Sequence, residues 1–194
     1  MLRRRRMVRR FTEEPVPDDV RERILAAAVR GPSAGFSQGW AFLVLEGSEQ
    51  TGRFWTASGA DLDAPDRWLE GLRKAQLLVL PLSSKDAYLD RYAEPDKGWA
   101  DRDEDRWPVP YWHVDAGMAA LLMLMTAVDE GLGGCFFGVP RTAIEPVRQA
   151  FGVPQAWAPV GAVAIGHPEP GAGSSTRRRR KPLEEVLHRG SWRS

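Results

Sequence analysis

Residues 111–130 read YWHVDAGMAALLMLMTAVDE, and Gly131 follows them. A nearly unbroken apolar run that is closed by a glycine predicts one long helix. Its most apolar part, Ala116–Val128, is only 13 residues long, which is too short to cross a bilayer. We therefore expect a soluble protein, not a membrane protein, with this helix buried at its centre.

Shorter apolar runs on both sides of that helix predict the strands of a sheet. The expected strands are Trp40–Leu45, Gln76–Leu82, Cys135–Val139 and Trp157–Ile165. Two more helices are expected, one from Pro15 to Gly31 and one over Pro140–Phe151. Helices and strands do not alternate regularly, and no Gly-x-Gly-x-x-Gly follows an early strand, which disfavours a Rossmann fold. The sequence favours a single α+β domain over residues 1–194.

The composition excludes several classes of protein. Cys135 is the only cysteine, so an intramolecular disulfide is impossible and a cytoplasmic location is expected. With His113, His167 and His188 it makes no metal-ligand pattern, so no metal is expected. Eight tryptophans exceed what a core of this size requires, and we expect some of them at a concave surface or an interface.

Cationic residues gather at the two ends of the chain. The front cluster is Arg3–Arg6 with Arg9 and Arg10, and the back cluster is Arg177–Arg180 with Lys181. Residues 11–176 carry 14 Lys and Arg against 24 Asp and Glu, a net charge of −10, while the whole chain carries +1. If the fold brings the clusters together, within one subunit or across two, they form a site for an anion such as a phosphate monoester. A nucleic-acid arm, a solvated charge run and a targeting signal are the alternatives.

Two segments differ in composition from the rest. Residues 83–110 combine eight acidic residues with Trp99 and Trp107. This mixture is too polar for the core and predicts a mobile lid or crossing arm, with a plain surface excursion as the alternative. Residues 168–194 form a C-terminal extension that is first rich in Pro, Gly and Ser and then basic. It ends in a short tail with the apolar residues Leu183, Val186, Leu187 and Trp192.

Four motifs follow one another along the chain. Residues 5–11 read Arg-Arg-Met-Val-Arg-Arg-Phe, residues 32–40 read Pro-Ser-Ala-Gly-Phe-Ser-Gln-Gly-Trp, residues 131–138 begin Gly-Leu-Gly, and residues 178–186 are basic and then acidic. In type and order they resemble the motifs of the FMN-dependent nitroreductases. The resemblance covers nearly the whole chain. It implies a mainly antiparallel sheet surrounded by helices, with a long buried central helix, in a homodimer whose tails are exchanged onto the partner.

The resemblance also implies that both cationic clusters hold FMN. It assigns the phosphate and the ribityl chain to Arg5, Arg9, Arg178 and Arg180. Arg6 is expected to reach the polar edge of the pyrimidine ring. Met7 replaces the serine of the family motif, so any FMN contact there is expected through its backbone. Guanidinium groups suit these tasks because they bind pairs of oxygen atoms bidentately, and the FMN phosphate carries close to two negative charges.

Two further motifs are expected beside the flavin ring. In the family, the loop at 32–38 packs on the flavin of the other subunit, which here assigns cofactor contacts to Pro32, Ser33, Ala34, Phe36 and Gln38. Phe36 replaces the usual Asn and Gly39 the usual Pro, so the range of substrates is expected to change more than flavin binding. The position facing flavin N5 corresponds to Phe137-Gly138. It has no hydroxyl side chain, which favours two-electron chemistry.

The implied activity is reduction of nitroaromatics, quinones or related electron-poor acceptors, driven by NADH or NADPH through ping-pong hydride transfer at flavin N5. No catalytic side chain is expected, since the flavin supplies the chemistry. The residues expected to face the substrate are Phe36, Trp99, Trp107, Tyr111 and Trp112. A flavin-sequestering protein or an FMN-dependent oxidase or biosynthetic enzyme is the main alternative. Nucleic-acid binding is disfavoured because the acidic body would repel phosphates.

Overall fold

The computed structural model describes residues 2–172 and 180–192. Its centre is one sheet with the strand order β1 (Trp40–Glu46), β2 (Leu77–Ser83), β5 (Ala162–Gly166) and β3 (Gly133–Phe137), and neighbouring strands pair antiparallel. A short strand, β4 (Ala158–Pro159), pairs with the end of β2. Every residue of β2 is buried, as expected for a central strand with helices on both faces.

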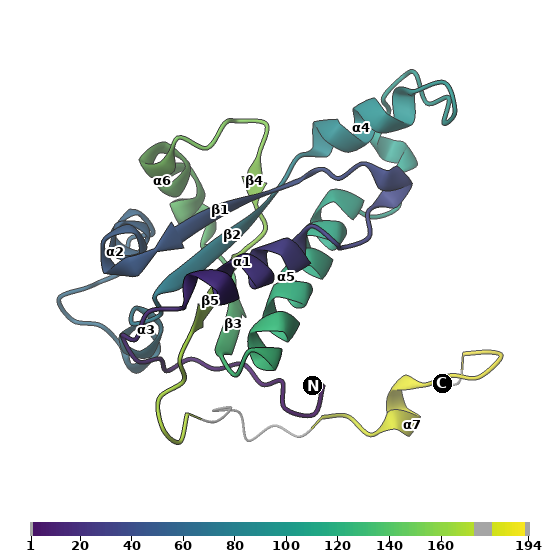
Figure 1. Ribbon diagram of the computed structural model, residues 1–194. Coiled ribbons are helices and arrows are strands. Elements are labelled where there is room, and N and C mark those ends of the chain that lie inside the picture. Colours follow the sequence, from purple (N-terminus) through teal and green to yellow (C-terminus); the bar gives the residue numbers. More distant parts are fainter. Residues whose placement is uncertain (1, 173–179, 193–194) are drawn as a thin grey trace.

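Helices cover both faces of the sheet (Figure 1). One face packs against α1 (Asp18–Ala28) and α5 (Tyr111–Asp129), and the other against α2 (Gly47–Ala57), α3 (Arg67–Leu72) and α6 (Arg141–Phe151). Residues of β2 alternate between these two cores, because successive strand side chains point to opposite faces. The predicted α+β fold is confirmed.

The central helix α5 is the predicted one, but it is longer than the 13-residue apolar run that was expected to be too short to cross a bilayer. The helix extends over 19 residues, and among the described residues it is the one helix long and apolar enough to cross a membrane by length and composition. In this structure Ala119, Ala120 and Met123 of the helix are buried in the core against α1 and the sheet. The opposite side of α5 leaves Val114, Met118 and Leu121 between 38% and 49% exposed.

All four predicted strands differ from the structure at one or both boundaries. Strand β3 begins two residues early, at Gly133, because its two glycines pack closely, Gly133 against Val8 and Gly134 against Leu124. The strand expected over 157–165 is divided into β4 and β5 around Gly161, where a side chain would collide with Phe136. Strand β2 extends to Ser83 instead of ending at Leu82.

Residues 83–110 are partly core, although their composition argued against it. They form helix α4 (Lys85–Ala93) and a short turn of 3-10 helix at Glu104–Arg106. Tyr88 is completely buried and Leu89 nearly so, so the expectation that the segment is too polar for the core was wrong at these positions. Whether the segment moves as a lid stays a prediction.

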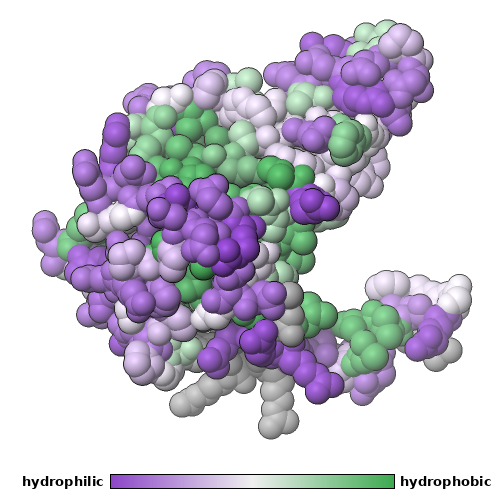
Figure 2. Space-filling model, viewed as in Figure 1, coloured by the Kyte–Doolittle hydropathy of each residue, from purple (hydrophilic) through white to green (hydrophobic). Residues whose placement is uncertain are grey.

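The end of the described chain lies away from the body. A short helix, α7 (Leu183–Val186), and the residues after it form an extended tail (Figure 1). Its apolar residues Leu183, Val186, Leu187 and Trp192 are 46–82% exposed. Figure 2 shows apolar residues on this tail and along the concave side of the molecule that faces it.

Candidate functional site

The front basic segment is attached to the edge of the sheet. Residues 5–12, which we call the arm, run beside β3, where Met7 forms a parallel bridge with Gly134. The Val8 N–H donates to the Gly134 carbonyl at 3.0 Å, and the Thr12 N–H donates to the His167 carbonyl at 2.8 Å. Val8 and Phe11 are buried in the core. The arm is therefore a fixed part of the fold.

The arm also packs closely on α3. The Phe11 N–H donates to the carbonyl of Gly71 at 3.3 Å. A Cβ atom at Gly71 would overlap the carbonyl oxygen of Arg9 and press on Arg10. This glycine is needed for the close approach of two backbones, and it sets the position from which the Arg9 side chain leaves the arm.

Arginines of the arm fall into two kinds. The Arg10 Nε donates to Glu169 Oε2 at 2.8 Å, and Lys74 Nζ lies 3.1 Å from the other carboxylate oxygen. Arg10 and Lys74 together hold the pKa of Glu169 below its ordinary value. By contrast, within residues 2–172 and 180–192 the side chains of Arg5, Arg6 and Arg9 make no hydrogen bond or ion pair. Unpaired guanidinium groups on a fixed backbone are suited to bind an anion.

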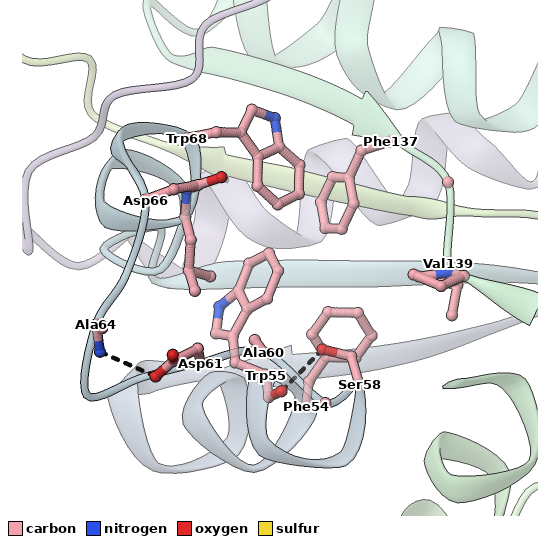
Figure 3. A pocket seen from close by; sticks show the side chains of 14 residues that line it. Phe54, Trp55, Ser58, Ala60, Asp61, Ala64, Asp66, Trp68, Phe137 and Val139 are labelled. Atoms are coloured by element: carbon pink, nitrogen blue, oxygen red, sulfur yellow. Dashed lines mark hydrogen bonds between the residues drawn. The ribbon is translucent and has the colours of Figure 1, made fainter. Parts of the chain in front are cut away.

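A cavity of about 350 Å³ opens where β3 ends (Figure 3). Its walls include Phe54 and Trp55 from α2, Trp68 from α3, and Phe137 and Gly138. The rings of Trp55 and Phe137 are stacked at 5.4 Å, and Trp68 stands perpendicular to both. A Cβ atom at Gly138 would meet nothing within 4 Å, so the backbone there is open to a flat group.

The same elements connect the arm with this cavity. Strand β3 contacts the arm at Gly134 and reaches the cavity at Phe137-Gly138, three to four residues or about 10–13 Å further along. Helix α3 contacts the arm through Gly71 and lines the cavity through Trp68. A ligand with a planar ring at one end and a phosphate at the other fits this arrangement.

The positions of Trp55 and Trp68 at the cavity were not predicted from the sequence. Both stand in short amphipathic helices, where an aromatic residue normally indicates core packing. The Nε1 donor of Trp55 is buried and has no acceptor among the residues that the structure describes. Such a donor is usually satisfied by a partner, and a bound ligand is one candidate.

The second predicted flavin motif, the loop of residues 32–38, lies on α4 and α5. The Ala34 N–H donates to Asp115 Oδ2 at 2.8 Å, and Arg91 Nε donates to the Gly35 carbonyl at 2.9 Å. In Figure 1 this part of the chain is at the α4 end, whereas the arm passes the opposite end of α5. Within one subunit the loop and the arm are therefore not brought together.

The loop holds two side chains in a strained backbone conformation. Phe36 has φ of 57° and Gln38 has φ of 49°, and a non-glycine residue in this region costs about 1–2 kcal/mol. Phe36 is nevertheless 74% exposed and gains nothing from the core of its own subunit. Pro32 and Gln38 are also exposed. Strain of this kind is concentrated at functional sites.

The aromatic residues expected at the substrate form one packed cluster beside that loop. The Trp107 ring lies 4.5–6.1 Å from the rings of Tyr92, Trp99, Tyr111 and Trp112. Trp112 is buried, and Tyr111 is 36% exposed. In one subunit this cluster lies beside the loop and not beside the cavity at Gly138.

Acidic residues of the 83–110 segment are mostly neutralised in place. Arg91 pairs with Glu94 and Asp96, and Arg102 pairs with Asp86 and Asp90. Lys85 pairs with Glu104, and Arg106 with Asp101. These ion pairs cancel much of the field of the acids, so the segment repels anions less than its composition indicates.

The back cluster is only partly described. Arg178 lies outside the described residues, and Arg180 is exposed at the start of the tail. Its predicted role at the FMN phosphate stays a prediction. Among the described residues no group of His, Cys, Asp and Glu is arranged to hold a metal ion.

Comparison with known proteins agrees with this geometry. The sequence profile described as the nitroreductase family matches residues 2–167. A protein of Escherichia coli K12, provisionally named the NAD(P)H nitroreductase YdjA, is 28% identical over 184 residues and 90% of each chain is covered. A protein of Methanothermobacter thermautotrophicus, provisionally named an NADH dehydrogenase/NAD(P)H nitroreductase, is 23% identical, with 89% of this chain and 78% of that protein covered.

Solved structures show the same fold. A nitroreductase family protein of Clostridium difficile 630 superimposes with a TM-score of 0.73 at 18% identity, covering 98% of this chain and 96% of that one. NfrA1 of Bacillus megaterium superimposes with a TM-score of 0.75 at 18% identity, covering 99% of this chain and 73% of that one. The order of the motifs, the sheet with its buried central helix and the match over residues 2–167 lead to one conclusion: this chain belongs to the nitroreductase family of oxidoreductases.

Proposed function

We propose that the protein is an FMN-dependent oxidoreductase that uses NADH or NADPH to reduce small electron-poor aromatic acceptors. One observation carries the proposal. The arm with its unpaired arginines bridges β3 at Gly134, and the aromatic cavity opens about 10–13 Å further along β3 at Phe137-Gly138, a distance that one FMN molecule can span. Bound FMN would supply hydride chemistry at N5, which no side chain in the cavity can provide.

Residues of the chain would act by binding and orientation. Arg5 and Arg9 would neutralise the phosphate, and Arg6 would hydrogen-bond the polar edge of the ring. A Cβ atom at Gly138 would meet nothing within 4 Å, and the backbone N–H of this residue would orient the reacting edge of the flavin. Trp55 and Trp68 would exclude water from that edge, which strengthens each electrostatic contact inside the site.

A homodimer completes this proposal. The loop with Phe36 lies away from the arm of its own subunit, so it can reach an arm only in a second copy. The exposed stripe on α5 formed by Val114, Met118 and Leu121, and the exposed apolar tail, offer surfaces for that copy. In the dimer, Phe36 and the aromatic cluster of Trp99, Trp107, Tyr111 and Trp112 would face the partner's flavin. These positions are the ones expected for an aromatic acceptor.

Two measurements test the function. The purified protein should be yellow and release FMN on denaturation, identified by chromatography. Under anaerobic conditions, NADH or NADPH should bleach the flavin, and menadione or a nitroaromatic should restore its colour. A colourless protein that does not bind added FMN would reject the proposal. A yellow protein that neither nucleotide reduces would instead support the flavin-sequestering or oxidase alternative.

A further inference from the structure

A buried carboxylate lies under the strained loop. Asp115 is 3% exposed and is the one acidic residue between Tyr111 and Val128. Its Oδ2 accepts from the Tyr88 hydroxyl at 2.7 Å and from the Ala34 N–H at 2.8 Å. Burial, and then the bond to Asp115, raise the pKa of Tyr88 well above its ordinary value, so the hydroxyl stays a donor. Burying a carboxylate costs free energy unless its oxygen atoms accept hydrogen bonds.

The surroundings of Asp115 restrain the loop from several directions. Arg91 holds the Gly35 carbonyl, and its guanidinium is itself fixed by Asp96 at 2.7 and 2.8 Å. Side chains at Gly35 and Gly39 would collide with the rings of Tyr92 and Tyr88. Helix α4 thus lies flat against the loop backbone, and the loop is held at both ends of its strained turn.

These contacts hold the loop in a conformation that core packing does not require. The loop that they restrain presents Phe36 to solvent, in a backbone conformation that phenylalanine disfavours. Without the restraints the chain would relax to negative φ, and the ring would turn away. The restraint is thus directed at the position of one exposed aromatic side chain.

We propose that Asp115 and Tyr88 are positioning residues that hold Phe36 against the flavin and acceptor of the partner subunit. The inference rests on the proposed function, since it requires a flavin site across the dimer. In this view α4 is a clamp for the loop, and residues 83–110 serve the site by fixing Phe36 as well as by covering it. Neither residue touches the cofactor itself.

The test compares matched variants of the full-length protein. Asp115→Asn keeps the shape but weakens both bonds, since charge-assisted bonds are about twice as strong as neutral ones. Tyr88→Phe removes one bond and is the second variant if Asp115→Asn does not fold. Tyr92→Phe is the control, because the Tyr92 hydroxyl makes no hydrogen bond among the described residues although its ring touches the same loop.

Hydrogen exchange gives the first readout and needs no flavin. The peptide covering residues 32–40 should exchange roughly three to ten times faster in Asp115→Asn and Tyr88→Phe than in Tyr92→Phe, because each 1.4 kcal/mol of lost restraint is a factor of ten in opening. Equal exchange in all three variants would overturn the clamp itself, whatever the protein binds.

Kinetics give the second readout. With menadione as acceptor, kcat/KM should fall roughly tenfold or more in Asp115→Asn, since small displacements at a reacting centre have large effects. The ratio of FMN to riboflavin affinity should stay as in the wild type, because the arm that is proposed to bind the phosphate is elsewhere. Faster exchange with unchanged kcat/KM and flavin circular dichroism would overturn the positioning role. A protein without any flavin would instead reject the proposed function and leave the exchange result valid.

Discussion

The two ends of α5 use arginine in opposite ways. We call the end beside residues 5–12 the arm side, and the end beside α4 and residues 83–110 the clamp side. On the clamp side, Arg91, Arg102 and Arg106 are each bonded to aspartates, and their charge serves the local structure. On the arm side, Arg5, Arg6 and Arg9 have no such partner among the residues that the structure describes. The backbone of the arm is firmly hydrogen-bonded nonetheless. A fixed backbone with unpaired charges indicates a ligand site, while paired charges indicate structure.

The comparison predicts that neither side is functional alone. Leu121→Lys places a charge in the exposed apolar stripe on α5, where a dimer would have to bury it without a partner. We expect loss of the dimer and, with it, loss of flavin binding and reductase activity. Sedimentation at micromolar concentration should then give a species of about 21.6 kDa. Glu49→Lys on the exposed surface of α2 is the charge control. An active, yellow monomer would disprove the shared site.

A second prediction separates the two kinds of arginine within the arm. Arg9→Ala should weaken FMN binding by about 1.5–3 kcal/mol, the cost of a lost charge-assisted partner, or roughly 10–150-fold. Riboflavin, which has no phosphate, should bind as before. Arg10→Ala is the matched control, because Arg10 is already paired with Glu169. Titration of the apoprotein by flavin fluorescence measures both. Equal effects of the two variants, or equal losses for FMN and riboflavin, would contradict the distinction.

The backbone of the arm can be displaced without touching its charges. Gly71→Ala inserts a Cβ atom where the Arg9 carbonyl lies. We expect a loss of about 1–3 kcal/mol of stability from overpacking, a fall in Tm of about 2–4 °C per kcal/mol, and weaker FMN binding. Gly52→Ala in α2, where a Cβ meets nothing within 4 Å, should not destabilise the protein. If Gly71→Ala lowers Tm but leaves FMN affinity unchanged, the close packing of arm and α3 does not set the flavin site.

The smallest expected effect is a difference in pH dependence. On the clamp side, burial lowers the pKa of His113, whose Nδ1 lies 2.9 Å from Ser83 Oγ. The folded state therefore binds a proton on His113 less readily than the unfolded state does. The free energy of unfolding should decrease as pH falls below about 6.5.

On the arm side, the pKa of Glu169 is lowered by Arg10 and Lys74. The ion pairs of Glu169 therefore stabilise the folded state above the ordinary pKa of this carboxyl group. This stabilisation is lost only in more acidic solution. Urea denaturation between pH 4 and 7 should show the His113 decrease in wild type and not in His113→Gln. Glu169→Gln should change only the acid end. If the free energy of unfolding depends on pH in the same way in wild type and His113→Gln, His113 does not cause the decrease.

Local sequence signals identified most of the fold but only part of the candidate site. The apolar run at 111–130 predicted α5, and the runs at 40–45 and 76–82 predicted β1 and β2, because hydrophobic periodicity reflects burial directly. The break at Gly161 could not be seen, since it depends on contact with Phe136 from a neighbouring strand. Gly133 and Gly134 stand in the motif predicted as a strand entry, yet they belong to the strand itself, where the arm packs on Gly133 and bridges to Gly134.

For the site, the residues that were missed are those whose role is set by tertiary contacts. Trp55 and Trp68 lie in separate helices and meet only across the cavity. Asp115 did leave a signal, a single acid within an apolar helix, and a buried acid of this kind calls for a partner. That partner, the backbone of residue 34, cannot be named without the fold. Conversely, the sequence shows that residues 83–110 are acidic, but it does not show which arginines pair with these acids.

The attachment of the arm also determines the order in which this protein can fold. Residues 7–12 are synthesised before both of their partners, Gly134 in β3 and His167 just after β5. The arm must therefore stay undocked until β3 and the residues after β5 have been made, because contacts between distant residues form late. We expect chains truncated before residue 133 to expose Val8 and Phe11, and to be candidates for aggregation or chaperone binding.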